Sequence, residues 1–161
     1  EIAHEIRPER GTREPETVEE MTTEGGLDVV KEYQAIKETA LVLENSGIET
    51  CLFIDPDVEQ IEMVKKTGVD MIEIHTGAYC DLEGRNRNHS EFSRLVNAVL
   101  TAAGHNLTVT AGHGIDYNSI KDFKGLPQIR EYSIGHSIIS RSVFAGLQQA
   151  VKDMKQLIEV L

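Results

Sequence analysis

Residues 106–117 read Asn-Leu-Thr-Val-Thr-Ala-Gly-His-Gly-Ile-Asp-Tyr, and this stretch decides the fold. Its first six residues alternate and favour β structure, which predicts a strand ending at Ala111. Glycine on both sides of His113 allows a sharp turn and a close approach to a ligand, because glycine has no Cβ atom. The stretch therefore predicts an imidazole at the edge of a sheet, where α/β enzymes keep their active sites.

A second stretch, residues 132–137, repeats the pattern as Tyr-Ser-Ile-Gly-His-Ser. It again predicts a strand, then the pair Gly135-His136, then a helix. A single histidine is more often packed or solvated than functional, but two Gly-His pairs at strand ends in one short chain favour a functional role. Backbone N–H groups at the start of a helix attract anions, so the second pair indicates a phosphate site.

The rest of the chain alternates between strand and helix patterns. A helix is expected over residues 27–45, and four strand–helix units follow it. The expected strands cover residues 49–54, 70–75, 106–111 and 130–134, and the expected helices cover residues 58–66, 90–103, 117–123 and 137–161. Such alternation predicts a parallel sheet with right-handed crossovers. We expect a single α/β domain over residues 1–161, half to two-thirds of a (β/α)8 TIM barrel, with residues 1–24 irregular and residues 10–15 turn-like.

The expected strand at residues 70–75 has two chemically different faces. Ile72 and Ile74 lie on one face, and Met71, Glu73 and His75 lie on the other. A carboxylate and an imidazole facing the interior are costly unless they are paired or used. A structural Glu–His pair and a catalytic role are therefore both open for Glu73 and His75.

Composition narrows the class of protein. The chain has 161 residues with a formal net charge of −11, which argues against a nucleic-acid surface but not against small phosphate ligands. No apolar run approaches the length of a membrane span, and no signal peptide is expected at the charged start. The two cysteines lack metal-ligand spacing and are too few for a disulfide scaffold, so a reducing cytoplasm is the expected compartment.

Five motifs, in chain order, closely resemble the pyridoxine 5′-phosphate synthase family. They are Thr22-Thr23-Glu24-Gly25-Gly26-Leu27-Asp28-Val29, Leu52-Phe53-Ile54-Asp55, Ile72-Glu73-Ile74-His75-Thr76-Gly77, Ala111-Gly112-His113-Gly114 and Ile134-Gly135-His136-Ser137. The resemblance implies a TIM-barrel enzyme that condenses 3-amino-2-oxopropyl phosphate with 1-deoxy-D-xylulose 5-phosphate. The products would be pyridoxine 5′-phosphate, inorganic phosphate and water, formed through proton transfers without a metal or an organic cofactor.

The resemblance also implies roles for individual residues. His113 would be a proton donor, and Glu73 would stabilise charge. The amino-ketone phosphate would be held by Gly114, Gly135 and His136, and the deoxyxylulose phosphate would contact Thr22. The implied assembly is a cytoplasmic homo-octamer. Edge strands left open in a partial barrel independently predict self-association.

The chain also departs from the family pattern. About a third of a standard barrel is missing before the first motif, with its first three strands, a catalytic histidine and a catalytic glutamate. In a gapless register, polar residues 10–14 replace an apolar fourth strand. The same residues also resemble the family's N-terminal Arg-Gly-Thr segment, as an internal deletion would produce, and this makes Arg10 a candidate phosphate ligand. Thr110 stands where the family pattern has Asn.

Three functions remain open at this level. The first is a pyridoxine 5′-phosphate synthase, and the second is a truncated, non-catalytic member of the family that still binds phosphate. The third, which ignores the resemblance, is another phosphate-handling βα enzyme such as an isomerase or an aldolase. No lysine lies at an expected strand end to form a Schiff base, which disfavours an aldolase.

Overall fold

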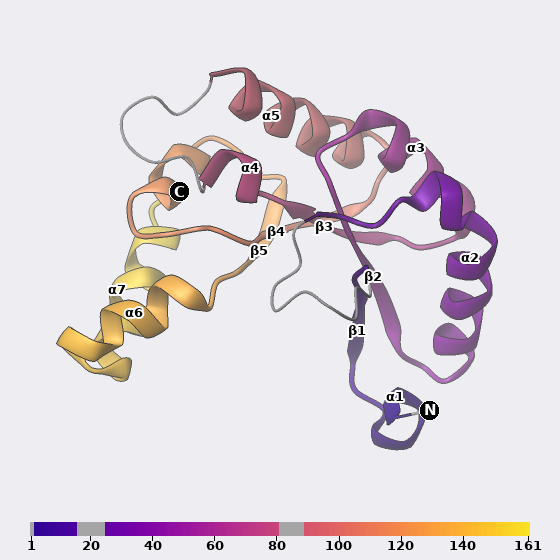
Figure 1. Ribbon diagram of the computed structural model, residues 1–161, viewed down its shortest axis with the longest axis horizontal. Coiled ribbons are helices and arrows are strands. Elements are labelled where there is room, and N and C mark those ends of the chain that lie inside the picture. The colour runs from indigo at the N-terminus through magenta and orange to yellow at the C-terminus, as the bar shows by residue number, and fades with distance from the viewer. Residues whose placement is uncertain (1, 16–24, 81–88) are drawn as a thin grey trace.

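The computed structural model describes residues 2–15, 25–80 and 89–161, and its centre is one parallel sheet (Figure 1). Five strands lie in the order β1-β2-β3-β4-β5. They are β1 (Arg10–Arg13), β2 (Glu49–Ile54), β3 (Met71–His75), β4 (Thr108–Gly112) and β5 (Ile129–Ser133). Every neighbouring pair is parallel. Sequence order equals spatial order, so the predicted fold, alternating βα units that form part of a TIM barrel, is confirmed.

Helices lie before, between and after the strands, and several of those between the strands cover one face of the sheet (Figure 1). They are α1 (Ile2–Ile6), α2 (Val29–Asn45), α3 (Val58–Thr67), α4 (Gly77–Cys80), α5 (His89–Gly104), the 3-10 helix η1 (Ser119–Phe123), α6 (His136–Ala145) and α7 (Leu147–Ile158). Local sequence explains several boundaries. The Asp57 carboxylate accepts hydrogen bonds from the first backbone N–H groups of α3, and Gly68, with φ 89°, ends that helix.

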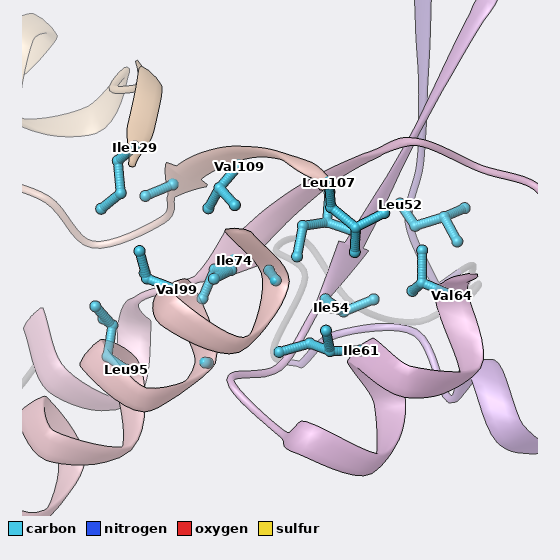
Figure 2. Close-up of a cluster of buried hydrophobic side chains, with 14 of the residues drawn as sticks. Leu52, Ile54, Ile61, Val64, Ile74, Leu95, Val99, Leu107, Val109 and Ile129 are labelled. Carbon is cyan, nitrogen blue, oxygen red and sulfur yellow. The ribbon is translucent and has the colours of Figure 1, made fainter. Parts of the chain in front are cut away.

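The apolar core lies between the sheet and the helices (Figure 2). From the strands, Leu52, Ile54 and Ile74 point toward α3 and α5 and are completely buried. Ile61 and Val64 of α3 and Leu95 and Val99 of α5 meet them. These strand residues alternate in sequence, so burial of this face leaves the intervening side chains on the opposite, inner face.

The sheet is bent around its inner face. β1 and β5 are the two edge strands, yet an Arg10 Nη1 atom lies 3.0 Å from an Oε2 atom of Glu131 on β5. The Arg10 Nε atom also contacts Glu49 on β2, at 3.1 Å. Side chains from opposite edges meet in this way only if the sheet curves, as the strands of a barrel do.

The prediction of a turn at residues 10–15 was wrong for residues 10–13, because they form β1 inside a segment that was expected to be irregular. Main-chain pairing with β2 holds the strand in place, and ion pairs on both faces of the sheet satisfy its charged side chains. Arg10 is paired on the inner face, and Arg13 Nη2 lies 3.0 Å from Glu32 of α2 on the other. This position of β1 is the one that the gapless register gives to a barrel's fourth strand.

The C-terminal helix predicted over residues 137–161 is two helices. Gly146 separates α6 from α7, because its backbone, with φ 80°, is not helical. Glycine suits this position, since residues with a Cβ atom rarely adopt such a conformation. Ala150 and Met154 of α7 are buried, whereas Val143 of α6 and Leu147 of α7 are exposed.

Candidate active site

The carboxyl ends of β3, β4 and β5 bring five of the predicted site residues to one end of the sheet: Glu73, His113, Gly114, Gly135 and His136. β4 ends at Gly112 and is followed by His113 and Gly114, while β5 ends at Ser133 and is followed by Gly135 and His136 at the start of α6. The two strands are adjacent and parallel, so both Gly-His pairs lie at the same end of the sheet, beyond the carboxyl ends of the strands. His113 is half-buried, and Gly114, Gly135 and His136 are exposed.

Glu73 lies on the inner face of β3 and is held by a side chain from β5, two strands away. The Ser133 hydroxyl on β5 donates a hydrogen bond to Glu73 Oε2 at 2.9 Å. Burial raises the pKa of the Glu73 carboxyl above its ordinary value, although the Ser133 hydrogen bond opposes this shift. A Cβ atom on Gly112 would collide with Glu73 Oε1 and lie 3.0 Å from Ser133 Cβ. Glycine at residue 112 therefore makes room for the carboxylate.

His113 has a left-handed backbone, with φ 74°, which is uncommon for a residue other than glycine. Thr76, directly after β3, holds this conformation. Its hydroxyl oxygen lies 2.9 Å from the Gly112 carbonyl oxygen and 2.5 Å from that of His113, and its N–H donates to the Gly112 carbonyl at 2.9 Å. Strained backbone that its surroundings hold in place is common in active sites.

His75 and Glu73 have separate partners, so the structural Glu–His pair considered above is replaced by two different contacts. His75 Nδ1 lies 2.9 Å from Asp55 Oδ1, just beyond the end of β2. The hydrogen bond from His75 and one from the Gly26 backbone N–H keep the pKa of Asp55 below its ordinary value. The His75 ring also packs against the rings of Phe53 and His113, with centroid distances of 5.1 and 4.8 Å.

Residues 25–27 cross the end of β2 beside this cluster. The Leu27 N–H donates to the Phe53 carbonyl at 2.8 Å, and a Cβ atom on Gly26 would collide with the backbone of Ile54 and Asp55. The motif that begins at Thr22 therefore reaches the same edge of the sheet through its described residues. Thr22 itself lies outside the described residues.

Arg10 does not join this site. It is the first residue of β1, so it lies at the amino ends of the strands, whereas the site occupies the carboxyl ends. Its guanidinium is already bound by Glu49 and Glu131.

Sequence reasoning missed three supporting residues: Asp55, Thr76 and Ser133. Each lies at or just past a strand end. Their positions in the sequence could have identified them, because short polar side chains at the carboxyl ends of parallel strands face the usual place of an active site. Across the described ranges, no three His, Cys, Asp or Glu side chains are grouped as a metal site would need. Among the helices of those ranges, none has the length and apolar content to cross a membrane.

Comparison with known proteins places these residues in a family. The family model described as "Pyridoxal phosphate biosynthesis protein PdxJ" matches residues 1–160. This match includes β1.

Curated relatives named pyridoxine 5′-phosphate synthase agree. The protein of Desulforapulum autotrophicum is 49% identical over 99% of this chain and 67% of its own length. The protein of Desulfatibacillum aliphaticivorans is 46% identical over 97% and 65%. That of Chlorobium phaeobacteroides is 43% identical over 99% and 67%. The chain thus spans about two thirds of the length of these relatives, and, as the resemblance predicted, it belongs to the pyridoxine 5′-phosphate synthase (PdxJ) family.

Proposed function

We propose that this chain supplies catalytic and phosphate-binding groups for pyridoxine 5′-phosphate synthesis. The reaction is the condensation of 3-amino-2-oxopropyl phosphate with 1-deoxy-D-xylulose 5-phosphate, which yields pyridoxine 5′-phosphate, phosphate and water. One observation carries the proposal: a half-buried carboxyl, Glu73, and a conformationally held imidazole, His113, lie at the same end of adjacent strands. Such a condensation requires repeated proton transfers, which these two groups are suited to provide.

In this proposal, His113 is the proton donor. An imidazole changes protonation near neutral pH, so one group can both give and recover a proton during the successive steps. Thr76 holds the backbone of His113 in place through the carbonyl oxygens of Gly112 and His113.

Glu73 stabilises positive charge that develops on the nitrogen-containing intermediates. Ser133 fixes one of its carboxylate oxygens, and Gly112 leaves room for the other. Burial away from water strengthens the interaction of a carboxylate with a nearby cationic centre.

The amino-ketone phosphate is assigned to Gly114, Gly135 and His136. A Cβ atom on Gly135 would meet no other atom within 4 Å, so the backbone here is open to a ligand. His136 begins α6, a helix of 10 residues whose free N–H groups favour an anion. The deoxyxylulose phosphate is assigned to Thr22 on the resemblance alone.

We also propose that the protein works in the cytoplasm as a homo-oligomer. Exposed apolar side chains on the α6–α7 pair support self-association: Ile139, Val143, Phe144 and Leu147. Sedimentation velocity tests this directly, because a monomer at all concentrations would contradict it. Exchange of Phe144, which is 93% exposed, for Glu should weaken the assembly without touching the proposed site.

The catalytic proposal is tested by joining this chain to the amino-terminal third of the Desulforapulum autotrophicum synthase and assaying the two phosphates. We expect pyridoxine 5′-phosphate, detected by mass spectrometry. His113→Asn should lower the rate by about 100-fold or more, because loss of a general acid costs that much and Asn tolerates the left-handed backbone.

His105→Asn is a matched control, because residue 105 lies between α5 and β4, at the opposite ends of the strands. A folded chimera that binds phosphate but makes no product would contradict the catalytic proposal and favour the non-catalytic alternative.

A further inference from the structure

The pair of the half-exposed Asp55 and the buried His75 has no part in the proposed function. The His75 side chain is only 7% exposed, and its Nδ1 atom is bound to Asp55. Its other ring nitrogen, Nε2, is buried and has no hydrogen-bond partner among the described residues. Buried polar atoms are nearly always hydrogen-bonded, so this nitrogen requires an explanation.

Asp55 determines which nitrogen of His75 carries the proton. Its carboxylate also accepts the Gly26 N–H, and it can only accept hydrogen bonds while ionised. The proton of a neutral His75 ring is therefore on Nδ1, and Nε2 presents a lone pair. A carboxylate on one side of an imidazole and a free lone pair on the other is an arrangement that enzymes use to orient proton transfer.

His113 is the group placed to use that lone pair. Its ring and that of His75 make an edge contact, with centroids 4.8 Å apart and an interplanar angle of 73°. Phe53 packs against both rings, at centroid distances of 5.1 and 6.5 Å, and is itself buried. The structure records no hydrogen bond between these two rings, so such a bond requires the His113 ring to turn within this contact.

We propose that His75 is a positioning residue for His113, and that its Nε2 atom accepts a hydrogen bond from a ring N–H of His113. Asp55, His75 and His113 then form one chain of hydrogen bonds that begins at a carboxylate. The inference deepens the proposed function, on which it rests, because it explains how His113 would present the same nitrogen to a substrate each time.

Protons balance over one cycle of this arrangement. A protonated His113 gives the proton on its ligand-facing nitrogen to the substrate and keeps the proton on the nitrogen that faces His75. The ring returns to its starting state when the first nitrogen is protonated again, and His75 keeps its Nδ1 proton throughout.

The test is NMR of the 161-residue chain with 15N-labelled histidine rings, well above the ordinary imidazole pKa of about 6.5. Each neutral ring then shows which nitrogen is protonated. We expect His75 to carry its proton on Nδ1 and His113 to favour one tautomer, by about fivefold for one net hydrogen bond.

Three variants separate positioning from packing. His75→Phe keeps the ring contact with Phe53 but has no nitrogen, so the tautomer preference of His113 should be lost. His75→Gln puts an amide near the position of Nε2 and should restore part of the preference. Asp55→Asn, which has nearly the same shape as the native residue, should release His75 from its single tautomer and weaken the preference of His113.

An unchanged His113 tautomer ratio in both His75→Phe and Asp55→Asn would overturn the proposal, because a packing role alone predicts no change. If the backbone amide spectrum shows that His75→Phe does not fold, Asp55→Asn decides the question alone. The measurement needs no turnover, so it is independent of the synthase assay. Inorganic phosphate is added separately, and missing shifts at Gly114 and Gly135 would count against the proposed function only.

Discussion

The two faces of β3 differ in what they contribute to the molecule. Ile72 and Ile74 on the outer face are completely buried against the helices. Glu73 and His75 on the inner face are held by Ser133 and Asp55, through hydrogen bonds that reach the ends of β5 and β2. One five-residue strand thus contributes packing on one side and titratable groups on the other. Stability and chemistry are therefore separable by substitution at adjacent residues.

The largest effect is expected on the outer face. Ile74→Ala should lower the free energy of unfolding by about 2–5 kcal/mol, because it leaves a cavity in the packed core. Glu73→Gln, at the adjacent residue, should change it by less than about 1 kcal/mol near neutral pH. Urea unfolding followed by circular dichroism measures both values. Equal losses of unfolding free energy in the two variants would show that the inner face stabilises the fold as much as the outer face does.

Gly112 offers an intermediate test, because it lies on the inner face between the two candidate catalytic groups. Gly112→Ala should cost about 1–3 kcal/mol of unfolding free energy, since the new methyl group collides with Glu73 and crowds Ser133. Gly104→Ala is the matched control, because a Cβ atom there meets nothing within 4 Å.

Adding Glu73→Ala to Gly112→Ala should recover part of the loss, as a double-mutant cycle would show. Strict additivity of the two changes would mean that the carboxylate does not occupy the space beside Gly112.

The smallest effect is a pH dependence that separates the two acids of the site. The folded-state pKa of Glu73 is raised, so the folded state binds its proton more tightly than the unfolded state. Stability from this group is complete below the ordinary value of 4.5 and is lost as pH rises through the folded-state pKa.

Glu73→Gln should therefore remove a decline in stability just above that pH. Asp55, whose pKa is lowered, gives the opposite result: its contribution is lost as pH falls below the ordinary value of 3.8. Unfolding free energies measured between about pH 3 and 7 would show both slopes. A decline that persists in Glu73→Gln would assign it to another group.

The sequence was sufficient to predict the features that depend on local pattern. Alternation in residues 70–75 predicted the two faces of β3, and each Gly-His pair was found after a strand. Partner choice was not predictable in the same way. Ser133 reaches Glu73 across 60 residues of sequence, and His75 found Asp55 rather than Glu73.

β1 was missed for a related reason. Its residues, Arg-Gly-Thr-Arg, have no apolar alternation. The strand depends on pairing with β2 and on ion pairs with Glu32 and with Glu131, which is 121 residues away from Arg10. Propensity within a short window cannot register such distant partners. Likewise, a single helix was expected over residues 137–161, and the break at Gly146 was missed.

The contact of Arg10 with Glu131 also affects the net charge of the inner face of the sheet. Glu14 and Glu131 both act on Glu73 with like charge, and Arg10 is the cation that offsets them. The Arg10 guanidinium is already paired with two carboxylates, so the inner face of the sheet keeps an excess of negative charge. Such an interior repels anions. In the proposed function, the acidic inner face would thus act as an electrostatic barrier that keeps the phosphate groups of the substrates at the carboxyl ends of the strands, near His113.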